Sequence, residues 1–261
     1  MRNFFLNKVA IVTGASRGLG REIARLLASK GARVVLAARS AEALEQLADE
    51  ITRSGGQALV VPTDITQQEQ VERLIQATLD HWQQVDILIA NAGQYIRCPV
   101  DKLTPEIMQQ SMAVNFYGNL YQVISVLPHM RSRNSGHIVL ILTMDVKTPI
   151  PPDAPYVAAK SAMSGLAEVL RQELHGSGIS LMAVYPGRID TSMIANLSFS
   201  PISAKIPPIV VAQAILKGIE RRRSRLLLPA QVHILNMLNF FFPAIADWTV
   251  RLFHLEGWED N

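Results

Sequence analysis

A tyrosine and a lysine four residues apart, Tyr156 and Lys160, are the side chains of this chain best suited to acid–base chemistry. In a helix, two residues at this spacing lie on the same face, one turn apart. A phenol with an ordinary pKa of about 10 is a poor proton donor or acceptor near neutral pH. An ammonium group within about 6 Å stabilises the phenolate and lowers that pKa. The spacing therefore predicts an acid–base pair, although most isolated pairs of this kind are ordinary surface residues.

A second group of residues is suited to binding phosphate. An apolar run, Val9–Val12, leads into Thr13-Gly14-Ala15-Ser16-Arg17-Gly18-Leu19-Gly20, and an amphipathic helix follows directly. Glycines at such a turn let backbone N–H groups approach a pyrophosphate, and the N-terminus of the helix adds a favourable dipole. Glycines alone would equally suit a tight turn between a strand and a helix. Their position directly after a first strand favours the phosphate site.

Composition sets the outer limits. The 261 residues are 49% hydrophobic and 18% charged, which excludes a disordered chain and allows one large core. A single cysteine, Cys98, excludes an intramolecular disulfide and a cysteine-based zinc cluster, and no metal site is expected. The net charge of +3 suits an anionic cofactor or a membrane surface. Basic and aromatic residues do not interleave, so we expect no nucleic-acid partner. Residues 1–7 are charged and too short for a signal peptide, which predicts a cytoplasmic protein.

Short β-branched runs alternate with longer amphipathic segments, the pattern of βαβ units that form a parallel sheet covered on both faces. The expected strands are Lys8–Thr13, Arg33–Ala38, Ala58–Pro62, Asp86–Ala90, His137–Leu142, Ser180–Tyr185 and Arg225–Leu228. The expected helices are Leu19–Lys30, Ala41–Ser54, Gln67–Gln83, Pro105–Arg131, Tyr156–His175 and Pro208–Arg222. Two irregular segments, Thr148–Pro155 and Gly187–Pro208, are expected as loops at the sheet edge that binds ligands. We therefore predict one doubly wound α/β domain with a seven-stranded Rossmann-type sheet over residues 1–228, and residues 229–261 as its extension.

The glycine spacing G-x-x-x-G-x-G differs from the usual dinucleotide fingerprint and, together with four further motifs, resembles the short-chain dehydrogenase/reductase family. The other motifs stand in the family's order over roughly residues 8–228. They are Asn91-Ala92-Gly93 after the fourth strand, Asn115 in the central helix, Tyr156-x-x-x-Lys160, and Pro186-Gly187 with Thr191. The resemblance implies an oxidoreductase that transfers hydride between a nicotinamide coenzyme and a ketone, aldehyde or alcohol.

The resemblance also assigns roles. Tyr156 would give a proton to the carbonyl oxygen, and Lys160 would hold the nicotinamide ribose. Asn115 would support a water that connects the lysine to solvent, although it could also be a helix-packing amide. The family normally has a serine thirteen residues before the tyrosine, where this chain has Thr143. Threonine supplies the same hydroxyl with an added methyl group, so activity should survive with a narrower pocket.

The choice between NAD(H) and NADP(H) depends on the end of the second strand. In dinucleotide folds, a carboxylate there binds the two ribose hydroxyls of NAD. This chain has Ala38 and Arg39 instead, and Arg17 in the glycine loop should lie on the same side. Two guanidinium groups can clamp a 2′-phosphate, which predicts NADP(H) as the cofactor. Asp64 after the third strand either contacts the adenine, as the family position does, or is an ordinary helix N-cap.

The remaining expected coenzyme contacts come from the resemblance. The expected coenzyme-binding set is Gly14, Ser16, Arg17, Gly18, Leu19, Gly20, Arg39, Asp64, Asn91, Ala92, Gly93, Tyr156, Lys160, Pro186, Gly187 and Thr191. Pro186-Gly187 and Thr191 would hold the carboxamide end of the nicotinamide. Near Thr143, the residues Asp145 and Lys147 differ from the small residues expected there, and either line the pocket or pair with each other.

The final segment, Gln231–Leu255, has apolar residues at spacings of three and four, which predicts an amphipathic helix bent at Pro243. Prolines, polar residues and charges make it a poor membrane span. Three roles are open for this helix. It either covers an apolar pocket or a dimer seam, or lies at a membrane interface beside the basic cluster Arg221–Arg225, or packs as a core helix.

These observations predict an NADP(H)-dependent reductase for an apolar or lipid-like carbonyl substrate, with 3-ketosphinganine, steroid and 3-oxoacyl thioester types as examples. The alternative is a nucleotide-binding regulatory or scaffolding protein that kept the fold without efficient chemistry, for which Thr143 is the only support. By resemblance the protein should be a homodimer or homotetramer formed through Pro105–Arg131 and Tyr156–His175, with a peripheral membrane contact as a further possibility.

Overall fold

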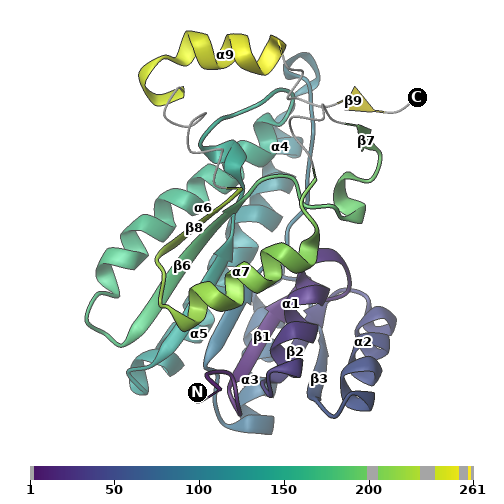
Figure 1. Ribbon diagram of the computed structural model, residues 1–261, viewed down its shortest axis with the longest axis vertical. Coiled ribbons are helices and arrows are strands. Elements are labelled where there is room, and N and C mark those ends of the chain that lie inside the picture. Colours follow the sequence, from purple (N-terminus) through teal and green to yellow (C-terminus); the bar gives the residue numbers. More distant parts are fainter. Residues whose placement is uncertain (1–2, 199–204, 230–238, 253–257, 260–261) are drawn as a thin grey trace.

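The structure is a computed structural model that describes residues 3–198, 205–229, 239–252 and 258–259 (Figure 1). Its centre is a parallel sheet in the order β3-β2-β1-β4-β5-β6-β8, which confirms the expected seven-stranded doubly wound fold. The strands are β1 (Val9–Thr13), β2 (Arg33–Ala38), β3 (Gln57–Pro62), β4 (Ile87–Ala90), β5 (Gly136–Ile141), β6 (Ile179–Pro186) and β8 (Arg225–Leu228). From β1 the strand order runs one way across the sheet to β3, and from β4 it runs the other way to β8. Such folds bind ligands where the strand order reverses, which here is between β1 and β4.

Alternating residues of each strand supply the cores on the two faces of the sheet. In β1, Ala10 and Val12 face one core and Val9 and Ile11 face the other. The first core is closed by α1 (Gly18–Ser29), α2 (Ala41–Arg53) and α7 (Pro208–Glu220). The second is closed by α3 (Gln68–Trp82), α5 (Gly118–Ser132) and α6 (Ala154–Glu173). Because both faces are covered, the strands are continuously apolar, as expected for a parallel sheet.

The expected helix Pro105–Arg131 is present, but it contains one π-helical turn that the sequence does not predict. The chain forms α4 (Pro105–Met112), then one π-helical turn η2 (Ala113–Tyr117), and then α5. Within the π turn, Asn115 is fully buried, and its side-chain amide donates to the backbone oxygen of Gln94 at 2.9 Å. This bond fixes Asn115 against the loop after β4. The π turn therefore lets the Asn115 side chain face the carboxyl edge of the sheet.

The irregular segment after β6 contains two short elements, η4 (Ser192–Ile194) and β7 (Leu197–Ser198). The chain returns to this segment near its end, where β9 (Trp258–Glu259) pairs antiparallel with β7. The described part of the extension also includes α9 (Pro243–Leu252), and Phe242 interrupts the helix just before Pro243, as expected for a bend there. The first half of the expected helix, residues 230–238, and residues 253–257 lie outside the described residues.

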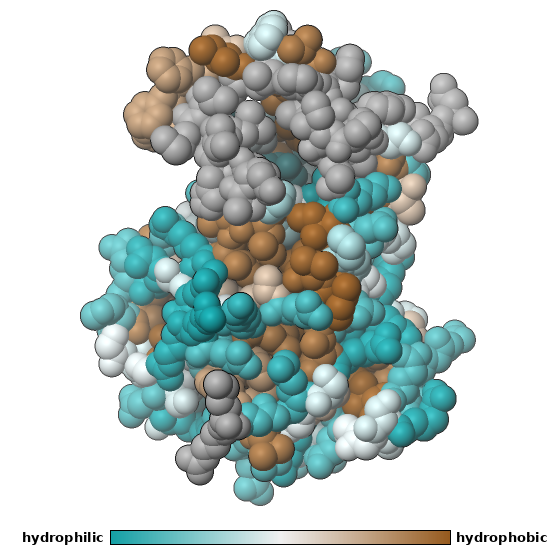
Figure 2. Space-filling model, in the orientation of Figure 1, coloured by the Kyte–Doolittle hydropathy of each residue, from teal (hydrophilic) through white to brown (hydrophobic). Residues whose placement is uncertain are grey.

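Helix α9 presents apolar side chains to the surface. Figure 2 shows these hydrophobic residues at the top of the molecule. Ile245, Trp248 and Leu252 of α9 recur at spacings of three and four and are all about half exposed or more, as is Phe241 just before the helix, whereas Val250 is buried. The expectation of a core helix is therefore wrong for this face. No helix in the described ranges is long and apolar enough to cross a membrane.

The expected proximity of α9 to the basic cluster is also wrong. The cluster Arg221–Arg225 lies in the turn between α7 and β8, at the amino edge of the sheet, while α9 lies beyond the carboxyl edge (Figure 1). The full length of β8 separates the two. Arg225 is in addition bound to Glu168 of α6, with its Nε 2.9 Å from Oε1. The cluster therefore cannot reinforce a contact made by α9.

Candidate active site

The predicted site residues gather at one edge of the sheet. Because all seven strands are parallel, the loops after β1, β4, β5 and β6 leave the sheet on the same side. These loops carry the glycine turn, Asn91-Ala92-Gly93, Thr143 and Pro186-Gly187, and α6 brings Tyr156 and Lys160 to the same edge. Helix α6 begins at Ala154, two residues before Tyr156, so the tyrosine lies in its first turn.

The glycine loop has the backbone that a closely held phosphate requires. Gly14 and Gly18 have φ angles of +65° and +57°, which residues other than glycine rarely adopt. A Cβ atom at Gly20 would lie 2.3 Å from the carbonyl oxygen of Gly14, so a side chain there is excluded. The loop also donates from the Ala15 N–H to the Ala37 carbonyl at 3.2 Å, which places it against the end of β2. The three glycines therefore form a shallow cradle of backbone.

Helix α1 supplies the N–H groups for that cradle. Its N-cap is Arg17, which makes no capping hydrogen bond with its side chain, and its first turn has no acidic residue. Ser16 precedes this N-cap, and Leu19 anchors the first turn in the core with an exposed fraction of only 6%. An uncapped helix N-terminus beside a glycine cradle fits the pyrophosphate of a dinucleotide.

The segment Asn91-Ala92-Gly93 holds this cradle in place. The side-chain amide of Asn91 donates to the Thr13 carbonyl at 2.9 Å, and the backbone N–H groups of Asn91 and Ala92 donate to Thr13 Oγ1 at 3.1 and 3.2 Å. The end of β1 is thereby joined to the end of β4. Gly93 lies where a Cβ would be 3.0 Å from Asn115 Oδ1 and 3.5 Å from Lys160 Nζ. The motif thus connects the phosphate cradle to the predicted catalytic lysine.

Tyr156 and Lys160 have the relation expected from their spacing. Lys160 Nζ lies 5.9 Å from the centre of the Tyr156 ring and donates to the Ile141 carbonyl at 2.8 Å. Lys160 is almost fully buried, and burial lowers the pKa of its ammonium to about 8. Asn115 accepts a hydrogen bond from the Gln94 N–H at 3.1 Å, so it stabilises the loop between β4 and α4 beside the lysine.

The pKa of Tyr156 differs from the expectation. Burial raises it above its ordinary value of 10, and the carboxylates of Asp145 and Asp153 raise it further. The protein groups alone therefore raise this pKa, whereas the expected lowering also depends on the positive charge that an oxidised nicotinamide would bring to the site. Burial of the phenol is the largest cause, the two carboxylates add to it, and a hydrogen bond with Thr143 opposes them. In this chain, Tyr156 is held in its protonated form.

Thr143 lies where the resemblance places it, at the end of β5 and beside Tyr156. A hydrogen bond between its side chain and the Tyr156 phenol lowers the pKa of that phenol. The same hydroxyl donates to Asp145 Oδ2 at 2.7 Å and accepts from the Asp145 N–H at 3.2 Å. Lys147 does not pair with Asp145 in the described structure, since its ammonium lies 5.0 Å from the centre of the Tyr185 ring. Of the two expected alternatives, Asp145 lines the site.

Sequence reasoning missed a polar cluster beside the catalytic pair. Asp153 is fully buried at the N-cap of α6 and accepts hydrogen bonds from Tyr95 Oη at 2.5 Å and from Arg97 Nε at 3.3 Å. The Tyr95 ring meets the Tyr156 ring edge to face, with centres 5.0 Å apart. Burial raises the pKa of Asp153 to about 6. Tyr95 and Asp153 are 58 residues apart in sequence, so no local pattern marks the pair.

Three more predicted residues stand at the nucleotide side. Arg17 and Arg39 are exposed, and neither guanidinium forms an ion pair with another described residue. Asp64 is not the N-cap of α3, which is Gln67. Its Oδ1 instead accepts from the N–H and hydroxyl of Thr66 at 3.0 and 2.8 Å. The N-cap alternative is therefore wrong.

The segment after β6 closes the other side of the cradle. Pro186 ends β6, and the Gly187 N–H donates to the Leu228 carbonyl at 2.6 Å. Thr191 lies against the glycine loop, where a Cβ built on Gly18 would be 3.1 Å from its methyl carbon. The loop after β6 therefore lies beside the glycine loop.

Comparison with known proteins agrees with this geometry. The model of the short chain dehydrogenase family matches residues 8–200. The chain belongs to the short-chain dehydrogenase family. Among curated relatives, an uncharacterized oxidoreductase of Listeria monocytogenes is 36% identical over 74% of this chain and 78% of its own length. A fatty acyl-CoA reductase of Acinetobacter baylyi is 34% identical over 84% of this chain and 75% of its own length.

Solved structures of short-chain dehydrogenases have the same fold. One from Burkholderia phymatum, in complex with NAD, has a TM-score of 0.84 and 25% identity, over 92% of this chain and 95% of that one. Actinorhodin polyketide ketoreductase with NADPH has a TM-score of 0.79 and 29% identity, over 85% and 95% of the two chains. The protein is therefore an oxidoreductase with a nucleotide-binding Rossmann fold.

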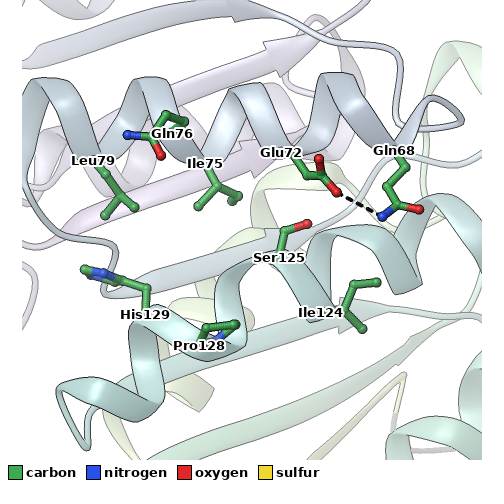
Figure 3. Close-up of a pocket in the computed structure, with 9 residues that line it drawn as sticks. All are labelled: Gln68, Glu72, Ile75, Gln76, Leu79, Ile124, Ser125, Pro128 and His129. Carbon is green, nitrogen blue, oxygen red and sulfur yellow. Dashed lines mark hydrogen bonds between the residues drawn. The ribbon is translucent and has the colours of Figure 1, made fainter.

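A hollow elsewhere on this short-chain dehydrogenase is separate from the candidate site. It lies between α3 and α5, has a volume of about 520 Å³, and is lined by apolar residues such as Ile75, Leu79 and Ile124 (Figure 3). Near its rim, Gln68 donates to Glu72 at 2.9 Å. The lining includes no predicted site residue, and its polar groups do not converge. The carboxyl edge of the sheet remains the candidate active site.

Proposed function

We propose that the protein is an NADP(H)-dependent oxidoreductase that interconverts a ketone or aldehyde and an alcohol. The observation that carries the proposal is the convergence of Tyr156, Lys160 and Thr143 beside a backbone cradle at the carboxyl edge of the sheet. Chance assembly of a phenol, a buried ammonium and a hydroxyl next to a phosphate-binding turn is improbable in a protein without such chemistry.

The proposed roles follow from the contacts. The bound coenzyme supplies the hydride. Tyr156, held protonated, donates its proton to the carbonyl oxygen during reduction, and Thr143 polarises that oxygen. Lys160, fixed by the Ile141 carbonyl, holds the nicotinamide ribose hydroxyls, and Asn115 orders the proton path beside it.

The remaining chain positions the coenzyme. The glycine loop and the N-terminus of α1 would hold the pyrophosphate, and Asn91-Ala92-Gly93 supports that loop. Pro186, Gly187 and Thr191 would hold the carboxamide end. Asp64 would contact the adenine, since its carboxylate remains partly exposed beyond the end of β3.

The preference for NADP(H) rests on charge. No acid stands at the end of β2, and the exposed Arg17 and Arg39 flank the site where an adenine ribose phosphate would lie. The related ketoreductase holds NADPH and the related dehydrogenase holds NAD, so the family supports both choices. The two arginines support the proposed preference for NADP(H).

The proposed substrate is apolar or lipid-like and carries its carbonyl at a polar end. A relative that is a fatty acyl-CoA reductase supports the chain-like part, and the cluster of Tyr95 and Asp153 supports a polar reacting end. The test is NADPH oxidation measured with long-chain aldehydes, 3-oxoacyl thioesters and steroid ketones, against short polar carbonyls as controls. Turnover of a long-chain carbonyl is expected. No turnover with any carbonyl, together with tight NADPH binding, would favour the scaffolding alternative.

We also propose that the protein forms a homodimer or homotetramer through α5 and α6. Ile124 of α5 and Val169 of α6 are 44% and 50% exposed although both are apolar. The double variant Ile124→Glu/Val169→Glu is therefore expected to be monomeric in sedimentation velocity, with Leu6→Glu as a matched control that keeps the native mass. A native protein that is itself monomeric at micromolar concentration would contradict this assembly.

Finally, we propose that α9 brings this cytoplasmic protein to a membrane surface. Its outward apolar stripe includes Trp248, which is 60% exposed, and interfacial helices favour such aromatic residues. Asn239 donates to the Lys147 carbonyl at 2.9 Å, so the start of this segment is tied to the loop that carries Asp145. A lipid-like substrate could then enter directly from the bilayer.

The full-length protein is expected to sediment with phosphatidylcholine vesicles, and the variant Ile245→Glu/Trp248→Glu is expected to lose most of that binding. Leu6→Glu, an equal change at the opposite edge of the sheet, should bind as the native protein does. If the native protein stays in the supernatant, and the α9 variant changes its mass in sedimentation velocity, the stripe is a contact between subunits instead.

A further inference from the structure

The hydroxyl of Thr143 is already committed to a neighbour two residues away. Its hydrogen is donated to Asp145 Oδ2 at 2.7 Å, and its oxygen accepts from the Asp145 backbone N–H at 3.2 Å. A threonine hydroxyl has one hydrogen and two lone pairs. With Asp145 ionised, the hydroxyl has a lone pair left for a partner but no hydrogen. Thr143 can then accept a hydrogen bond from an alcohol, but cannot donate one to a carbonyl.

Protonation of Asp145 reverses this arrangement. A neutral carboxylic acid can donate its own O–H to Thr143 Oγ1. The threonine hydrogen is then released and can point at the substrate carbonyl, where a positive partner stabilises the negative charge that develops on the oxygen. The direction of one hydrogen bond, set at Asp145, thus decides whether Thr143 assists reduction.

We propose that Asp145 is a positioning residue that controls the hydrogen-bond direction of Thr143, so that the site is most competent for carbonyl reduction when Asp145 carries a proton. This inference rests on the proposed function and adds a residue to it. Asp145 touches Thr143 and is not assigned a contact with substrate or coenzyme. It acts through the threonine alone.

The surroundings of Asp145 favour its protonated form more than water does. Burial raises its pKa, while the hydrogen bond from Thr143 and the positive charge of Arg188 lower it, and burial is the largest cause. Arg188 comes from the loop after β6. From α6 and the loop after β4, the groups that interact with its charge are Asp153, Tyr156 and Tyr95, all of whose pKa values it raises. Burial therefore favours the neutral acid, and the single arginine on the third side opposes it.

The test is the pH profile of kcat/KM for NADPH-dependent reduction between about pH 5 and about pH 9, for the native protein, D145N and D145A. The native value is expected to fall by about tenfold per pH unit above the pKa of Asp145, because one proton is lost there. An amide at position 145 can donate to Thr143 at every pH, and an alanine leaves the hydroxyl free. Both variants should therefore lack this fall in kcat/KM, and both should be faster than the native protein at high pH.

Two comparisons separate this role from others. Burial lowers the pKa of the Lys160 ammonium to about 8. Any change of kcat/KM that comes from the titration of Lys160 should therefore persist in both variants. In a T143A background, D145N should have no further effect on the profile, because the residue acts through the threonine. D80N, which changes an exposed carboxylate on α3, should keep the native profile. An unchanged fall in kcat/KM in D145N and D145A, or the same D145N effect in T143A, would overturn the inference.

A readout without turnover distinguishes this inference from the proposed function. The infrared spectrum of the native protein minus that of D145N should contain the band of a protonated carboxylic acid. This band should disappear as the pH rises. Observation of only the carboxylate across the whole range would overturn the inference even if the enzyme reduces carbonyls. A titrating band with no turnover of any carbonyl would uphold the state of Asp145 and count against the proposed reaction. Thermal unfolding of each variant checks that the fold is intact.

Discussion

Replacing Tyr156 with phenylalanine is expected to lower kcat/KM for NADPH-dependent carbonyl reduction by about 10²- to 10⁴-fold. The phenol is the group that we propose as the proton donor, and its high pKa keeps that proton in place at neutral pH. Phenylalanine keeps the ring that packs against Tyr95 but removes the oxygen. The measurement is the initial rate of NADPH oxidation with the best carbonyl substrate, and NADPH affinity by fluorescence titration should change little.

The matched control is Tyr117→Phe, which removes a phenol from an exposed position on the same helix as Asn115. It should retain native kcat and KM. Equal rates for Tyr156→Phe and the native protein would remove Tyr156 as the acid. A loss of coenzyme affinity as large as the loss of rate would instead assign Tyr156 a role in binding.

The second large effect concerns the coenzyme. Arg39→Ala is expected to weaken NADPH binding by about 10- to 100-fold and leave NADH binding almost unchanged, since a charge-assisted bond to a phosphate is lost only with the 2′-phosphate. Arg17→Ala should act in the same direction, and the double variant should bind the two coenzymes with similar affinity. Dissociation constants from fluorescence titration are the measurement.

Arg53→Ala serves as the control, because this arginine is an exposed residue in the last turn of α2. It should leave both affinities unchanged. If Arg39→Ala weakens NADPH and NADH equally, the arginine supports the fold of the loop and does not read the phosphate. A stronger binding of NADH than NADPH by the native protein would contradict the preference itself.

Much of the fold follows from the sequence because its signals are local. Each strand is a short apolar run that must be buried on both faces, and all seven strands lie within one residue of their expected bounds. The α-helices before residue 229 lie within two residues of their expected bounds, although the helix over Pro105–Arg131 contains a π turn. The glycine turn could be placed because only a close backbone approach explains glycine at those three positions.

The π turn could not be predicted, because its cause is a distant contact. Asn115 is pulled toward the loop after β4 by hydrogen bonds to Gln94, 21 residues away in sequence. Local propensity favours a continuous α-helix over Pro105–Arg131, and tertiary structure overrides it. The buried cluster around Asp153 was missed for the same reason.

The electrostatics of the site were the least accessible from sequence. The spacing of Tyr156 and Lys160 predicts a lowered phenol pKa, yet burial and two carboxylates raise it. One of these carboxylates, Asp145, was visible as an unexpected residue after Thr143, but only the structure shows that it binds the threonine hydroxyl. Charges from separate loops add up in space, and sequence distance says little about them.

The π turn at Ala113–Tyr117 limits how the length of this chain can change. Such a turn contains one residue more than an α-helical turn and takes up that residue locally. A one-residue deletion here would let the helix close as regular α-helix, and would remove the bulge that brings Asn115 to the loop after β4. We therefore expect descendants of this gene to accept length changes at the open turn near Gly55 and to preserve the residue count between Ser111 and Asn119.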